Sequence, residues 1–147
     1  MGTLDAEPLG PIEPIELMAY TRADPGAAWA ALTEPAVVAE WFTDASPVGP
    51  VGSPYRLDFG DGSVVEGVIV ALEPGTRFAH TWAWAGDAGS GSTLVSWAIA
   101  AEPGGGSRIT LVHAGWSEAG ADVATREDHR GYWEMYLSDL VILLDGV

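Results

Sequence analysis

The sequence contains neither cysteine nor lysine, and it has no apolar run of 18 residues. Without cysteine, neither a disulfide framework nor a thiolate metal site can form, and the redox compartment is left undecided. A transmembrane helix needs a long apolar run, and a signal peptide needs a basic and a hydrophobic part at the N-terminus. Because neither pattern is present, we expect a cytoplasmic protein without membrane insertion.

Positive charge is also scarce. Six basic side chains, all arginine, stand against 21 acidic ones, and the formal charge is −15 over 147 residues. A phosphate backbone or an anionic membrane surface would be repelled by this charge. We therefore predict no nucleic acid partner. The acids are scattered, as is typical of a solvated surface, and we assign the acids around the 60–62 hairpin to this role.

The longest periodic segment runs from Asp122 to Leu144 and predicts a helix of about 22 residues, roughly 33 Å long. Asp122 is the expected N-cap, and Gly146 lies where the helix must stop. One face of this helix carries polar residues first and apolar residues later: Arg126, His129, Trp133, Leu137, Leu140 and Leu144. Its second half should be buried, and something as large as a sheet must cover it.

The chain before this helix predicts a loose tail over residues 1–14 and then one domain over residues 15–147. Alternation over residues 15–20 indicates a first strand. Asp24 should cap a short helix that begins at Pro25, and Thr33 should cap a second one near Pro35.

From Val51 onward the apolar period changes to two, which is typical of strands. Four further strands are expected over residues 63–72, 77–84, 93–101 and 108–114, after one that ends near Phe59. Gly60-Asp61-Gly62 is a strong hairpin signal. Consecutive hairpins demand an antiparallel sheet, so the fold class predicted is α+β, with a curled sheet of about six strands wrapped around the C-terminal helix.

Several short motifs carry a family resemblance. They are Asp24-Pro-Gly-Ala-Ala-Trp, Glu40-Trp-Phe, Thr81-Trp-Ala-Trp, Thr110-Leu-Val-His-Ala-Gly, and Trp133 with Tyr136-Leu. In this order they resemble the activator of heat-shock-protein-90 ATPase homologue-like family, of the START-like SRPBCC superfamily, over residues 15–144. The resemblance implies a helix-grip fold with a cavity between the concave sheet and the N-terminal half of the long helix. Such folds serve many functions.

Aromatic and polar residues are suitably placed to line that implied cavity. The candidates for ligand binding are Tyr55, Phe59, His80, Trp82, Trp84, His113, Arg126, His129 and Trp133, with Arg130 also at the rim. Aromatic walls with a few polar groups are typical of small-molecule sites. The alternative is that the rings simply fill a core. His113 matches a histidine position of the family, whereas His80 stands where the family more often has an aromatic or aliphatic residue.

We assign no catalytic residue, metal or cofactor. The three histidines lie on separate predicted elements, without the short spacings of a local metal motif. No Gly-x-Ser-x-Gly motif opens a helix, and the glycine-rich stretches are turns between strands rather than phosphate loops.

Three functions stay open, and we favour the first. It is non-enzymatic binding of a small hydrophobic or aromatic molecule in the cavity. The second is a polyketide cyclase or aromatase, in which His80 or His113 acts as general acid or base. The third, a chaperone ATPase co-regulator, comes from the family name alone. An exposed edge strand also leaves a homodimer open.

Overall fold

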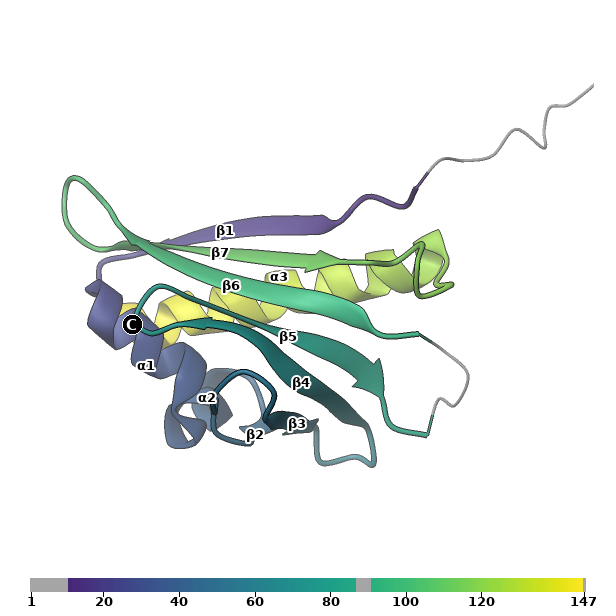
Figure 1. The fold of residues 1–147 in the computed structure, drawn as a ribbon. Coiled ribbons are helices and arrows are strands. Elements are labelled where there is room, and N and C mark those ends of the chain that lie inside the picture. Colours follow the sequence, from purple (N-terminus) through teal and green to yellow (C-terminus); the bar gives the residue numbers. More distant parts are fainter. Residues whose placement is uncertain (1–10, 87–90, 147) are drawn as a thin grey trace, which may run out of the picture.

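The computed structural model describes residues 11–86 and 91–146, and these form three helices and seven strands (Figure 1). In chain order the elements are β1 (Ile15–Thr21), α1 (Pro25–Thr33), α2 (Pro35–Trp41), β2 (Asp44–Ala45), β3 (Pro54–Asp58), β4 (Val64–Glu73), β5 (Arg77–Trp84), β6 (Thr93–Ala101), β7 (Ser107–Ala114) and α3 (Val123–Asp145). Most of the predicted tail, residues 1–10, lies outside the described residues, as do residues 87–90 in the connection between β5 and β6.

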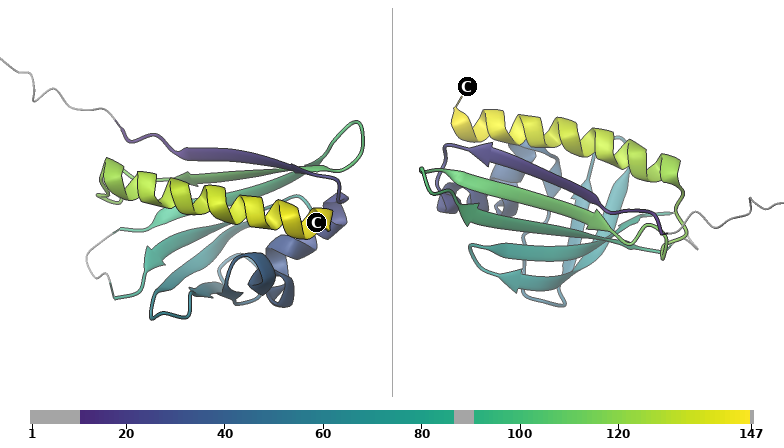
Figure 2. Two further views of the ribbon diagram at one scale, coloured as in Figure 1. Left: turned by 180° about the vertical axis from the view of Figure 1, so that it is seen from behind. Right: turned by 90° about the horizontal axis from the view of Figure 1, so that it is seen from above.

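The strands form one antiparallel sheet in the order β1-β7-β6-β5-β4-β3-β2, which curls around α3. Figure 2 shows α3 lying along the concave face, with α1 and α2 near its C-terminal end. The predicted helix-grip architecture is therefore confirmed. The seventh strand, β2, has only two residues, paired with the end of β3, and is too short to produce a visible alternation in the sequence.

Helix α3 begins and ends as its sequence predicts. The Asp122 carboxylate accepts a hydrogen bond from the backbone N–H of Thr125 at 2.8 Å, and Gly146 ends the helix with φ 75°, a left-handed conformation that glycine adopts without strain. Trp133, Leu137 and Leu140 are buried against the sheet and the short helices. The apolar second half of the helix thus supplies one wall of the core.

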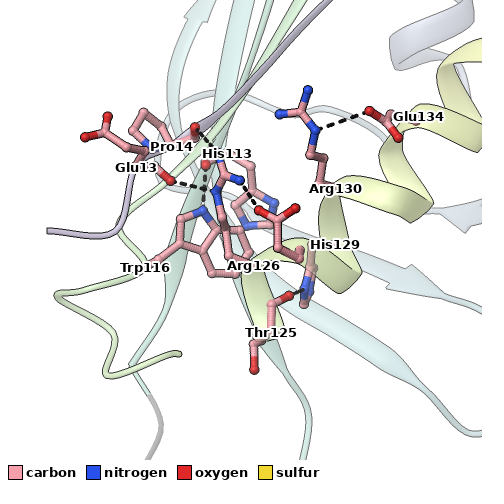
Figure 3. Close-up of polar contacts among 10 residues, drawn as sticks. Glu13, Pro14, His113, Trp116, Thr125, Arg126, His129, Arg130 and Glu134 are labelled. Atoms are coloured by element: carbon pink, nitrogen blue, oxygen red, sulfur yellow. Dashed lines mark hydrogen bonds and ion pairs between the residues drawn. The ribbon is translucent and has the colours of Figure 1, made fainter. Parts of the chain in front are cut away.

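Both ends of α3 are tied to the region around β1. The guanidinium of Arg126 donates to the carbonyls of Glu13 and Pro14 at 2.9 and 2.8 Å (Figure 3). At the other end, the carboxylate of Asp145 accepts from the Thr21 hydroxyl, at 2.5 Å. These contacts fix the helix along the edge of the sheet.

The two short helices differ from expectation in one cap. Asp24 caps α1 as predicted, with its carboxylate 2.8 Å from the N–H of Ala27. Thr33 does not cap α2, because it still belongs to α1 and its hydroxyl donates to the carbonyl of Trp29. Glu34 takes the cap position without a side-chain hydrogen bond.

Strands β4 and β5 are paired irregularly. The register shifts between Ile69 and Ala71, as in a β-bulge, which bends and twists a sheet. Nearby, the backbone N–H of Val68 bonds to the hydroxyl of Thr81. The irregularity lies on β4, opposite the part of β5 that contains Ala79 and His80.

Within residues 11–86 and 91–146, no helix is both long enough and apolar enough to span a bilayer.

Candidate functional site

A cavity of about 450 Å³ lies between the N-terminal half of α3, strand β5 and the hairpin that joins β3 to β4. Seven aromatic side chains, one histidine and three small polar residues line it. They are Phe42, Phe59, Asp61, Ser63, Trp82, Trp84, Asp128, His129, Tyr132, Trp133 and Tyr136. The cavity therefore occupies the place that the helix-grip resemblance implies.

Five of the nine predicted binding residues line this cavity: Phe59, Trp82, Trp84, His129 and Trp133. Their rings surround it in several orientations. Trp82 and Trp84 are perpendicular, with centroids 5.7 Å apart, and Trp84 lies 5.6 Å from Phe59. A second hollow of about 260 Å³ shares Trp82, Trp84 and His129. These three residues thus form a wall with space on both sides.

His129 holds this wall together in one tautomer. Its Nε2 accepts a hydrogen bond from the indole N–H of Trp84 at 3.3 Å. Its Nδ1 therefore carries the proton, which it donates to the carbonyl of Thr125 at 2.8 Å (Figure 3). The first turns of α3 and the end of β5 are connected through this imidazole.

His113 lies behind the cavity wall. Its Nδ1 accepts from the indole N–H of Trp133 at 3.0 Å, so its Nε2 carries the proton and donates to the hydroxyl of Thr93 at 2.7 Å. Burial, reinforced by the charges that His129 and His80 would carry, lowers the pKa of His113 to about 2. Both ring nitrogens are thus occupied by the protein, and this histidine is neutral and structural.

His80 and Tyr55 lie deeper in the core and do not line the cavity. The His80 ring is 2% exposed, and its Nδ1 lies 2.9 Å from the carbonyl of Thr81, at the irregular part of the β4–β5 pairing. Its ring centroid lies 4.5 Å from that of Tyr55. Burial lowers the pKa of His80 to about 4 and raises the pKa of the Tyr55 phenol. One ring nitrogen of His80 is thus paired with a carbonyl of its own strand.

The predicted rim arginines are engaged away from the cavity. Arg126 reaches toward the chain before β1, and Arg130 pairs with Glu134 at 3.2 Å (Figure 3). The ligand-binding roles assigned to Tyr55, His80, His113 and Arg126 therefore stay predictions that this cavity does not support.

Six cavity residues were not among the candidates: Phe42, Asp61, Ser63, Asp128, Tyr132 and Tyr136. Three of them could have been found, because Asp128, Tyr132 and Tyr136 follow each other at four-residue spacing beside the pair His129 and Trp133. Phe42 and the hairpin residues carry no such signal, since only the curl of the sheet brings them to the helix.

Two carboxylates, those of Asp61 and Asp128, line the cavity. Hydrogen bonds from Ser63 lower the pKa of the Asp61 carboxyl, so that it is ionised at neutral pH. Asp128 stands across the cavity on α3, and no arginine lines the cavity. Among the described residues, no three of His, Cys, Asp and Glu lie close enough together to hold a metal ion.

One buried donor in the wall is unsatisfied. The indole N–H of Trp82 is buried and has no hydrogen-bond partner among the described residues. Leaving such a group unpaired costs free energy.

The family model of the activator of Hsp90 ATPase homolog 1-like proteins matches residues 22–145. The chain belongs to this family. No curated protein matches the sequence.

Solved structures with the same fold include relatives of low identity. DynU16, a protein of the dynemicin biosynthetic locus, is 24% identical to this chain, with a TM-score of 0.78. The match covers 92% of this chain and 49% of DynU16. This chain therefore spans about half the length of DynU16. MLL2253 from Mesorhizobium loti is 20% identical over 92% of this chain and 98% of its own, with a TM-score of 0.81. The Aha1 dimer from Colwellia psychrerythraea is 21% identical over 91% and 97%, with a TM-score of 0.73. At these identities the likeness establishes the fold alone.

Proposed function

We propose that this protein binds a small aromatic molecule in the cavity between α3 and the β3–β4 hairpin, without transforming it. The observation that carries the proposal is the lining, in which seven aromatic rings surround a space of about 450 Å³. This volume falls within the roughly 300–1,000 Å³ of typical small-molecule sites, and a mostly apolar lining with a few polar groups is typical of them.

The energy available is sufficient for binding. Burial of about 300 Å² of apolar ligand surface at roughly 25 cal/mol/Å² gives about 7.5 kcal/mol before the costs of association are subtracted. The rings also belong to a packed wall. Trp82 contacts Trp133 at 5.4 Å between centroids, and Phe42 contacts Tyr136 at 4.8 Å. A wall that is already ordered loses little side-chain entropy when a ligand binds.

A cyclase that uses His80 or His113 as general acid or base has no support in this geometry. A catalytic base must come within hydrogen-bond reach of its substrate. Neither histidine lines the cavity, and both ring nitrogens of His113 already have protein partners. For this reason we place binding ahead of catalysis.

The test is a titration of intrinsic tryptophan fluorescence with neutral and charged flavonoids, naphthalenes and aromatic polyketides. Three tryptophans line the cavity, so a bound ring should change their emission. A matched pair of variants locates the effect. Tyr132 lines the cavity and is 63% exposed, whereas Tyr20 is 57% exposed on β1, outside the cavity.

We expect Tyr132→Ala to weaken binding severalfold and Tyr20→Ala to leave it unchanged. Because both side chains are exposed, neither change should unfold the protein. A flat response to every compound, or equal affinities in the two variants, would contradict the proposal.

A further inference from the structure

We propose that the ligand of this cavity is an aromatic cation, such as an arylalkylamine or a planar aromatic ammonium. This inference rests on the proposed function and adds the charge of the ligand to it. The observation behind it is the combination, in one cavity, of several aromatic rings with two carboxylates and no arginine, with His129 as the one imidazole of the lining.

The aromatic faces suit a cation. The negative face of an indole or phenol ring attracts an ammonium group within about 6 Å of its centroid, and tryptophan does so best. The ring planes of Trp82 and Trp84 are nearly perpendicular, at 89°, so the faces of the two rings point in different directions. Trp133 adds a third indole, tilted by 54° relative to Trp82. A cation in the cavity would lie beside more than one aromatic ring.

The carboxylates stand on opposite sides of the cavity. Asp61 belongs to the β3–β4 hairpin and Asp128 to the second turn of α3, and both line the space. Both side chains are exposed and therefore lie at the solvent-facing rim of the cavity. A bound ammonium would therefore lie between two acids, and a bound carboxylate would be repelled by both.

The surrounding cations do not neutralise these acids. Arg126 donates to the carbonyls of Glu13 and Pro14, and Arg130 pairs with Glu134. Both ring nitrogens of His129 already have protein partners, because its Nε2 accepts a hydrogen bond from Trp84 and its Nδ1 donates one to the carbonyl of Thr125. The charge of −15 over the whole chain adds a field of the same sign, which attracts cations from solution.

The experiment uses three ligands that share one ring and differ in charge: naphthylethylamine, naphthylethanol and naphthylpropionate. Their affinities for the full chain are measured by isothermal titration calorimetry at neutral pH. We expect the amine to bind about tenfold more tightly than the alcohol and the acid to bind most weakly. Added salt should weaken the amine alone, because salt screens charge attraction between partly exposed groups.

Asp61→Asn and Asp128→Asn should each weaken the amine up to about fivefold and leave the alcohol unchanged, as expected for the loss of one solvent-exposed charge. Asparagine keeps the side-chain oxygen that accepts from the backbone of Ser63, so the hairpin should persist. Glu16→Gln on β1 removes the same charge far from the cavity and should change neither affinity.

The outcomes separate the two proposals. Equal affinities for the three compounds, or tighter binding of the acid, would overturn the charge inference and leave aromatic binding standing. An amine affinity that is insensitive to both asparagine variants would also overturn it. Failure of all three compounds to bind would remove the proposed function and, with it, this inference.

Discussion

The indole nitrogen of Trp133 donates to Nδ1 of His113 across 3.0 Å of the protein interior. Trp133 faces the cavity, whereas His113 lies behind it and is completely buried. On its other side, His113 donates to Thr93, whose hydroxyl lies 3.4 Å from the carbonyl of Trp82. A buried, neutral histidine therefore fixes the position of one cavity wall relative to the strand that forms the next.

This relationship predicts different costs for the same substitution at two neighbouring residues. Trp133→Phe leaves Nδ1 of His113 buried without a donor, which should add about 1–3 kcal/mol to the cost of the lost ring volume. Trp82→Phe removes a donor that has no partner, so that extra cost is absent. Urea denaturation should show the larger loss of stability for Trp133→Phe. Equal losses would mean that the hydrogen bond to His113 contributes little.

The buried histidines predict that stability falls in mild acid. The pKa of His113 is lowered to about 2 and that of His80 to about 4, from an ordinary value of 6.5. Below pH 6.5 the unfolded chain therefore binds protons that the folded chain does not, so the free energy of unfolding decreases as the pH falls. Each histidine should contribute up to about 1.4 kcal/mol per pH unit.

Chemical denaturation between pH 6.5 and 5 measures the change in unfolding free energy per pH unit. In this range few carboxylates titrate, so they contribute little to the slope. His113→Gln and His80→Gln should each reduce the slope by the contribution of one proton, whatever they do to stability at neutral pH. An unchanged slope in both variants would show that neither histidine is neutral in the fold.

Two glycines predict opposite effects of one added methyl group. A Cβ at Gly67 would lie 1.9 Å from the carbonyl oxygen of Thr81, so the β4–β5 backbone would have to shift. Gly67→Ala should therefore destabilise the protein by about 1–3 kcal/mol. Gly131 lies within α3, exposed, with nothing within 4 Å of its Cβ position.

Gly131→Ala should stabilise the fold by up to about 1 kcal/mol, because alanine loses less backbone entropy in a helix. Thermal unfolding of the two variants beside the parent protein measures both effects. A tolerated alanine at position 67 would imply that β4 and β5 are not held in the irregular pairing described above.

The local pattern of the sequence was sufficient for the main elements of the fold. A helical period from Asp122 onward predicted α3 with its N-cap, and alternation over residues 77–84 predicted β5 with its bounds. Both signals are strong because one face of each element is buried over many residues. The cap at Thr33 was wrong because two short helices follow each other directly, and a cap residue of one can still belong to the other.

The sequence also predicted part of the candidate site correctly and part of it not. Phe59, Trp82, Trp84, His129 and Trp133 could be proposed from the sequence because strand and helix periods place them on the concave face and on the facing helix stripe. The same periods also selected His80 and His113, since alternation tells which side of a sheet a residue faces but not how deep it lies. Depth depends on packing between elements that are distant in the chain.

By itself, the sequence determined the order of the elements, the inward face of each, and a surface poor in positive charge, because these depend on periods of a few residues and on composition. Only the tertiary structure decided which inward residues meet open space. The curl of the sheet brings Asp61 from a hairpin opposite Asp128 on the helix, and hydrogen bonds turn Arg126 and Arg130 away. The negative charge of the cavity therefore depends on the tertiary structure, because its two carboxylates lie on elements that are far apart in the sequence.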